Sequence, residues 1–108
     1  MDFLTKTVKF PASIDDGAIA QFHHQTDLAL QSDVDVLLID FATVESTSSH
    51  GLMALVTAHK RVREANKRLF LRSVSGQVRM LLEMTGMDEV FEVLPESEDI
   101  DNPALVAA

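Results

Sequence analysis

The sequence predicts a small α/β fold in which helices pack against a mostly parallel sheet of four strands. Two short apolar runs, residues 36–41 and 69–71, have the continuous hydrophobic character of strands covered on both faces. Segments with the apolar spacing of helices alternate with these runs along the chain. Such alternation is typical of parallel sheets with right-handed crossovers, and 108 residues suit a single domain.

The first strand is expected over residues 3–10, where apolar side chains alternate with Thr and Lys. Asp15 or Asp16 then caps a helix that runs to about Gln31, because a short polar side chain satisfies the unpaired N–H groups of a first turn. Residues on the apolar face of this helix recur at spacings of three and four: Ile19, Phe22, Thr26 and Leu30.

A second helix is expected from about Gly51 to Ala65, ending at Asn66 because Asn tolerates left-handed backbone geometry. Its predicted buried stripe is Leu52, Leu55, Val56, His59 and Val62. Ser75 caps a third helix over residues 76–85, which Gly86 ends. Its stripe is Val78, Leu81, Leu82 and Thr85. The last strand is expected over residues 90–94, up to Pro95, which supplies no backbone donor.

Composition excludes several functional classes. A net charge of −8 would repel nucleic acid and anionic membrane surfaces. No run of about 18 apolar residues is present, and the first ten residues lack the apolar core of a signal peptide, so we expect a cytoplasmic protein without direct membrane insertion. The absence of Cys excludes disulfides, thiolate metal sites and Cys nucleophiles.

Charge is unevenly distributed along the chain. Most positive residues lie within residues 60–79, whereas carboxylates gather in the first half and over residues 88–101. This pattern is compatible with a solvated helix face, or with an acidic surface that steers a basic protein partner.

The segment over residues 43–51 carries the strongest functional signal. It contains four consecutive hydroxyl residues, Ser46 to Ser49, and leads directly into the second helix. One hydroxyl suffices as the N-cap, and the others can be ordinary polar loop residues. A phosphate on one of these serines would instead face the positive end of the helix dipole and several free N–H groups, which suits a phosphorylation switch.

Several blocks together resemble the STAS family, in particular the anti-sigma-factor antagonists. The blocks are residues 38–41 with Val44, residues 48–52, residues 60–62, residues 69–71 and, most strongly, residues 74–91. The resemblance covers about residues 3–94. It implies a STAS-like fold for a domain over residues 1–95. The acidic composition of residues 96–108 separately indicates a tail, which is expected to form one short helical turn or to fray.

The resemblance also implies a non-enzymatic partner switch without a cofactor. Such antagonists bind an anti-sigma factor that is also a Ser kinase, and phosphorylation at the start of the second helix ends the binding until a phosphatase acts. Ser49 corresponds to the family's acceptor, although Ser48 stays open as an alternative, since Ser48 replaces the family's Asp and His50 replaces a small residue. The expected partner-binding residues are Thr47, Ser48, Ser49, His50, Gly51 and Met53. The chain is expected to be a monomer or weak dimer.

The family resemblance allows a second function, a cytoplasmic accessory subunit of a lipid ABC transporter. Other chemistry has weaker support. The four histidines lack the spacing of a metal site, and residues 47–51 lack the first Gly of a hydrolase elbow. Met80, Met84 and Met87 could be core residues or an adaptable binding surface.

Overall fold

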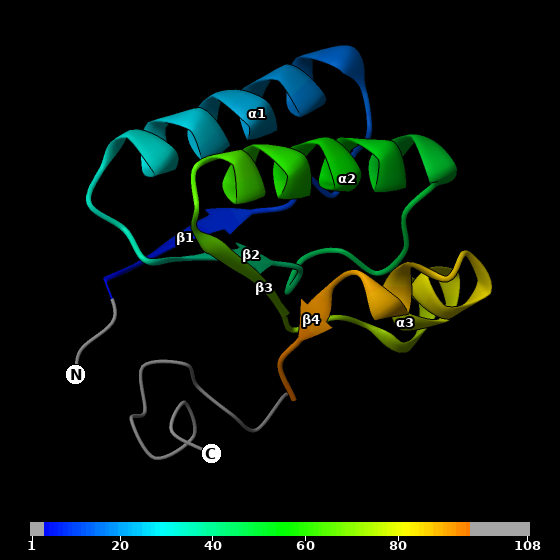
Figure 1. Cartoon of the computed structure of the whole chain (residues 1–108). Coiled ribbons are helices and arrows are strands. Elements are labelled where there is room, and N and C mark those ends of the chain that lie inside the picture. Colours follow the sequence, from blue (N-terminus) through cyan, green and yellow to red (C-terminus); the bar gives the residue numbers. More distant parts are fainter. Residues whose placement is uncertain (1–3, 96–108) are drawn as a thin grey trace.

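Four parallel strands form the centre of the computed structural model, which describes residues 4–95 (Figure 1). The strands are β1 (Thr5–Lys9), β2 (Val36–Asp40), β3 (Arg68–Arg72) and β4 (Glu92–Val93), and they lie side by side in that order. All three pairings are parallel, so the predicted α/β class is confirmed. The expected strand start at Phe3 and the tail over residues 96–108 lie outside the described residues.

Two long helices, α1 (Asp16–Gln31) and α2 (Ser49–Glu64), lie next to each other on one face of the sheet (Figure 1). The shorter α3 (Gly76–Met84) lies beyond the carboxyl ends of the strands, near the start of α2. Each helix begins at a polar cap whose side chain accepts a backbone N–H, namely Asp15, Ser48 and Ser75. These caps explain where the helices start.

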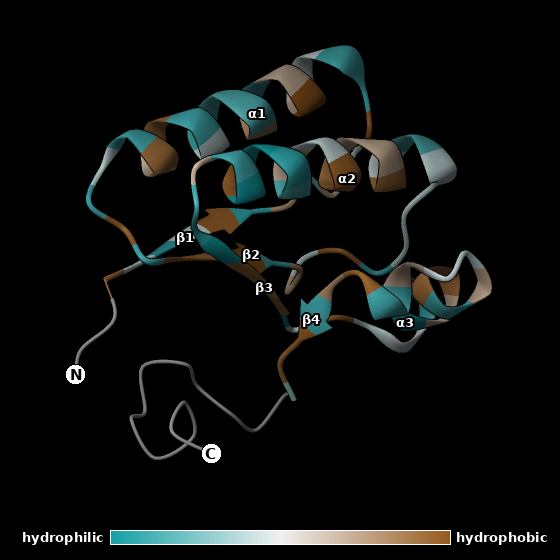
Figure 2. Cartoon of the chain, in the orientation of Figure 1, coloured by the Kyte–Doolittle hydropathy of each residue, from teal (hydrophilic) through white to brown (hydrophobic). Residues whose placement is uncertain are grey.

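The main core fills the space between the sheet and the helices. Figure 2 shows apolar residues along the strands and on parts of the helices. Phe10 stacks on Phe41 with ring centroids 4.6 Å apart and meets Phe22 edge-on at 5.1 Å. Burying three phenyl rings together removes a large apolar area from water, which makes this cluster a main anchor of α1 on the sheet.

Several predicted boundaries were wrong by a few residues. α2 begins at Ser49 rather than Gly51, because Ser48 serves as its cap. The last strand has two residues rather than five, because the N–H groups of Val90 and Phe91 donate to the Met87 carbonyl of the preceding 3₁₀ turn, η1 (Met87–Glu89), and not to β3. This turn begins after Gly86, whose φ of 74° confirms the predicted helix stop.

The left-handed end of α2 and most apolar stripes were predicted correctly. Asn66 has a φ of 59°, as expected for an Asn that follows a helix. In α3, however, Thr85 is exposed, and its hydroxyl donates to the carbonyl of Leu81 within the last turn. In α1, Ala29 is buried more deeply than Leu30 because the helix turns its small residue toward the core.

Candidate functional site

The start of α2 brings the predicted site residues into one turn. Ser48 has an extended backbone, and its Oγ accepts a hydrogen bond from the Gly51 N–H at 3.2 Å. The Ser48 carbonyl accepts the first helical bond, from the Leu52 N–H at 2.9 Å. Ser49 is therefore the first helical residue, with its side chain outside the cap hydrogen bond.

Four of these side chains are presented to solvent. Ser48, Ser49 and His50 are all exposed, and Met53 one turn later is 64% exposed. No hydrogen bond joins the Ser49 hydroxyl to another residue of the described part. The first turn of α2 contains no acidic residue, so no side chain within that turn neutralises the positive end of the helix dipole.

Thr47 and Gly51 form the inner side of this turn. The Thr47 Oγ1 atom is buried and has no hydrogen-bond partner among the described residues. It lies against Gly51, which is buried between Thr47 and Ile14. A glycine is needed here because a Cβ at position 51 would collide with Thr47 Oγ1 and crowd Ile14 at 3.2 Å.

The loop before α2 is held in its middle, at the adjacent residues Val44 and Glu45. Val44 is buried in the main core, and its N–H donates to the Phe41 carbonyl at 2.9 Å. The Glu45 carbonyl accepts a hydrogen bond from the Ser75 Oγ at 2.6 Å, and this Oγ also accepts from the Val78 N–H. One serine thus caps α3 and ties α3 to the loop that presents Ser49.

Sequence reasoning missed this link between the loop and α3. Ser75 was predicted as a cap only, because its contact with Glu45 joins residues thirty positions apart. Ser73, which precedes it, has a φ of 57°. Both serines line a shallow hollow at the carboxyl ends of β2 and β3, together with Phe41, Ala42, Thr43, Val44 and Glu45.

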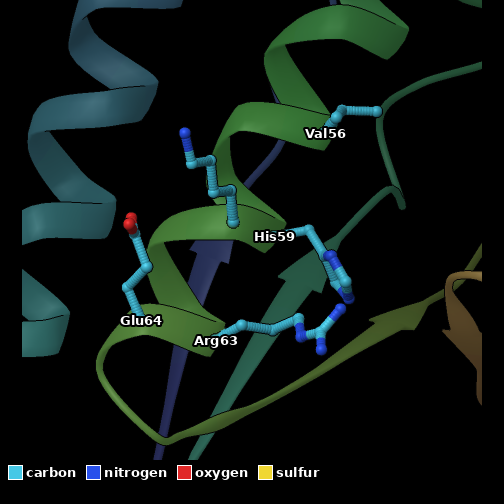
Figure 3. Close-up of a pocket in the computed structure, with 5 residues that line it drawn as sticks. Val56, His59, Arg63 and Glu64 are labelled. Carbon is cyan, nitrogen blue, oxygen red and sulfur yellow. The ribbon is translucent and has the colours of Figure 1, made fainter.

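A second hollow lies on the flank of α2 that faces β4 (Figure 3). His59 and Arg63 extend toward the strands, whereas Glu64 points away. The His59 ring meets Phe91 edge-on at 5.1 Å. Burial lowers the pKa of His59, and the nearby Arg63 charge lowers it further. We interpret His59 as a neutral packing residue, because its ring packs against Phe91 and makes no hydrogen bond to a carboxylate within residues 4–95.

Residues 4–95 contain neither a candidate metal cluster nor a membrane-spanning helix. Within that range no three His, Cys, Asp or Glu side chains gather closely enough to hold a metal ion. None of the described helices has the length and apolarity required to cross a bilayer. Two of the three methionines singled out from the sequence, Met80 and Met84, are 60% and 77% exposed, whereas Met87 packs against the core.

Comparison with known proteins gives one clear match. A family model described as STAS domain matches residues 4–100, which is nearly the whole chain. The search of curated proteins found no match.

Proposed function

Since the chain belongs to the STAS domain family, we propose that it is a regulatory protein-interaction module of the anti-sigma-factor-antagonist type. The start of α2 binds an anti-sigma factor that is also a Ser kinase, and phosphorylation of Ser49 ends this binding. A protein with this function would act in the cytoplasm, upstream of transcription. The proposal assigns no catalytic activity to the chain itself.

The exposed hydroxyl of Ser49 is the observation that carries the proposal. Ser48 is occupied as the helix cap, with its Oγ 3.2 Å from the Gly51 nitrogen. Ser49 is exposed at the next position and is not needed for capping. A kinase can therefore reach and modify Ser49 without removing a hydrogen bond on which the start of the helix depends. This difference favours Ser49 over Ser48 as the acceptor.

Phosphorylation would change the electrostatics of the docking surface. Transfer forms an ester bond between Ser49 Oγ and the γ-phosphorus of a nucleoside triphosphate, breaks the bond to the departing diphosphate and leaves the hydroxyl proton with a base of the kinase. The phosphate adds about −1.5 to −2 charges at pH 7. The α2 N-terminus stabilises this charge in the free protein, whereas an apolar or acidic partner surface would have to desolvate or oppose it.

Binding of the anti-sigma factor to Ser49 variants tests the proposal. We expect Ser49→Asp to lose at least tenfold in affinity for the anti-sigma factor, and Ser49→Ala to bind as the wild type does. Gln25→Glu is the matched control, because it adds one negative charge on the exposed side of α1. Equal partner recovery by wild type and Ser49→Asp would overturn the switch.

Modification at the site can be measured directly on protein from its native cell. We expect intact-mass spectrometry to show a phosphorylated fraction, with the modified residue mapped to Ser49 among residues 46–49. Modification at Ser48 instead would move the acceptor by one residue and contradict the capping argument.

A further inference from the structure

The sheet ends at β1, and one side of this strand has no neighbouring strand among residues 4–95. The strand order places β1 at an edge, with β2 on its other side (Figure 1). The side chains of Lys6, Thr7 and Lys9 are exposed, so this edge is open to solvent. An open edge strand presents unpaired N–H and C=O groups that can pair with a strand of another chain.

The pairing with β2 determines which backbone groups point outward. The Leu4 carbonyl accepts from the Val36 N–H at 3.2 Å, and the Phe10 N–H donates to the Asp40 carbonyl at 2.9 Å. Alternate residues of a parallel strand bond to the same neighbour, so the even-numbered residues of this segment bond to β2. Three residues therefore direct their N–H and C=O groups toward the open edge: Thr5, Thr7 and Lys9.

We propose that two copies of the chain pair β1 against β1 in antiparallel orientation, with Thr7 of one copy opposite Thr7 of the other. This register overlaps all residues of the strand and brings Thr5 of each copy opposite Lys9 of the other. The outward groups then form up to about six backbone hydrogen bonds. Such a two-fold interface uses the same surface on both copies, so that surface has to be self-complementary.

Leu4 and a hollow beside β1 supply this complementarity. Leu4 is 54% exposed and lies, by the two-residue period of a strand, on the same face as Val8 and Phe10. The hollow lies between β1 and α1, and its lining includes Phe10, Pro11 and Gln25. The proposed register places Leu4 of one copy opposite Phe10 of the other, and hence at this hollow. By symmetry the contact forms twice, and it removes apolar surface of both Leu4 side chains from water.

The stripe of α1 beside this edge carries no charge. Ala18, Gln21 and Gln25 line the hollow, and Leu28, which is 47% exposed, continues their stripe at helical spacing. The charged Asp27 lies on the other flank of α1, where it pairs with α2. An uncharged stripe can approach a second copy of itself without repulsion, whereas a net charge of −8 opposes contact over much of the remaining surface.

Two lysines of β1 limit the affinity of this dimer. Lys9 lies opposite Thr5 and Lys6 opposite Val8 of the other copy, so no cation lies directly opposite another. The two Lys6 side chains are diagonal neighbours, and salt screens their repulsion. We therefore expect a weak dimer that tightens as salt is added. The dimer is independent of the proposed switch, because no residue of this edge belongs to the start of α2.

Disulfide cross-linking tests the register in the full chain. The chain has no Cys, so one substitution introduces one thiol per copy. In Thr7→Cys the two Cα atoms would lie about 5.5 Å apart, within disulfide reach, and we expect mild oxidation to link most chains into dimers. Lys9→Cys is the matched control on the same strand and face, because its two sites lie about 13 Å apart along the strands, and it should stay unlinked. Failure of Thr7→Cys to cross-link, or equal cross-linking of both variants, would overturn the proposal.

Sedimentation equilibrium tests the backbone pairing and the Leu4 contact. Thr7→Pro removes an outward N–H without removing a bond to β2, so we expect it to weaken dimerisation at least tenfold, whereas Thr7→Val should dimerise as the wild type does. Leu4→Asp should also weaken dimerisation at least tenfold, and it leaves the backbone groups of β1 unchanged. Circular dichroism reports that each variant is folded. A wild type that stays monomeric up to millimolar concentration, or a folded Thr7→Pro or Leu4→Asp variant that dimerises as the wild type does, would overturn the proposal.

Discussion

The contact between Gly51 and Thr47 predicts that Gly51→Ala destabilises the protein. Replacing a helical Gly with Ala ordinarily stabilises by up to about 1 kcal/mol, because Ala restricts the unfolded chain and favours helix. Here the added Cβ would overlap with Thr47 Oγ1 and crowd Ile14 at 3.2 Å. Overpacking of this kind costs about 1–3 kcal/mol, so we expect a net loss of about 1–2 kcal/mol.

A control substitution at Gly76 and a second substitution at Thr47 test whether the collision causes the loss of stability. Gly76 lies in the first turn of α3, and a Cβ there would meet no atom within 4 Å. Gly76→Ala should therefore leave stability unchanged or raise it by up to about 1 kcal/mol. Thr47→Ala removes the colliding hydroxyl, which is buried without a partner among the described residues. In that background Gly51→Ala should become neutral or stabilising, a coupling of about 1–3 kcal/mol.

Urea unfolding followed by circular dichroism measures these differences. For a domain of this size the slope is about 1–1.5 kcal/mol per molar urea, so the Gly51→Ala midpoint should fall by about 1 M. A Gly51→Ala protein as stable as wild type would refute the packing argument. Loss of stability that persists unchanged in the Thr47→Ala background would show that Thr47 is not the colliding group.

Three further predictions use the same unfolding assay. Ser48→Ala should lower the free energy of unfolding by about 1 kcal/mol because it removes the α2 cap, whereas Ser49→Ala should stay within about 0.5 kcal/mol of wild type. Equal losses of stability in the two variants would contradict the separate roles of the two serines. Burial lowers the folded-state pKa of His23 and His59, so protons bind the unfolded chain preferentially and the free energy of unfolding should fall as pH drops below about 6.5. The double variant His23→Gln with His59→Gln should show a shallower fall. An unchanged dependence of stability on pH in this variant would exclude the two histidines as its source. Ser73→Gly should raise stability by about 0.5 kcal/mol by relieving a left-handed non-glycine residue, and a decrease would show that the serine side chain contributes more than its backbone geometry costs.

The hydrogen bond between Ser75 and Glu45 supports the loop that presents the proposed acceptor, Ser49. Because Ser75 Oγ binds the Glu45 carbonyl at 2.6 Å, the loop that leads to Ser49 is fixed to the start of α3. Buried Val44 anchors the same loop to the core. The acceptor hydroxyl is thus exposed on a well-supported turn, which limits the entropy lost when a partner docks.

Local signals in the sequence predicted the three helices and several of their ends. Asp15 and Ser75 were predicted as caps, and Asn66 and Gly86 as helix stops, because a cap bond or a left-handed residue involves only a few neighbouring positions. The continuous apolar run over residues 36–41 likewise predicted a central parallel strand, observed as β2. The ordered blocks of family-like sequence predicted the STAS fold, which is confirmed.

Only the tertiary structure decided how the four hydroxyls of residues 46–49 differ. Ser48 caps the helix, Ser49 is exposed, and the Thr47 hydroxyl is turned inward against Gly51. The short last strand and the hydrogen bond from Ser75 to the Glu45 carbonyl could likewise not be predicted from the sequence. These features depend on contacts between segments far apart in the chain, and packing against a distant segment overrides the local preference of any single residue.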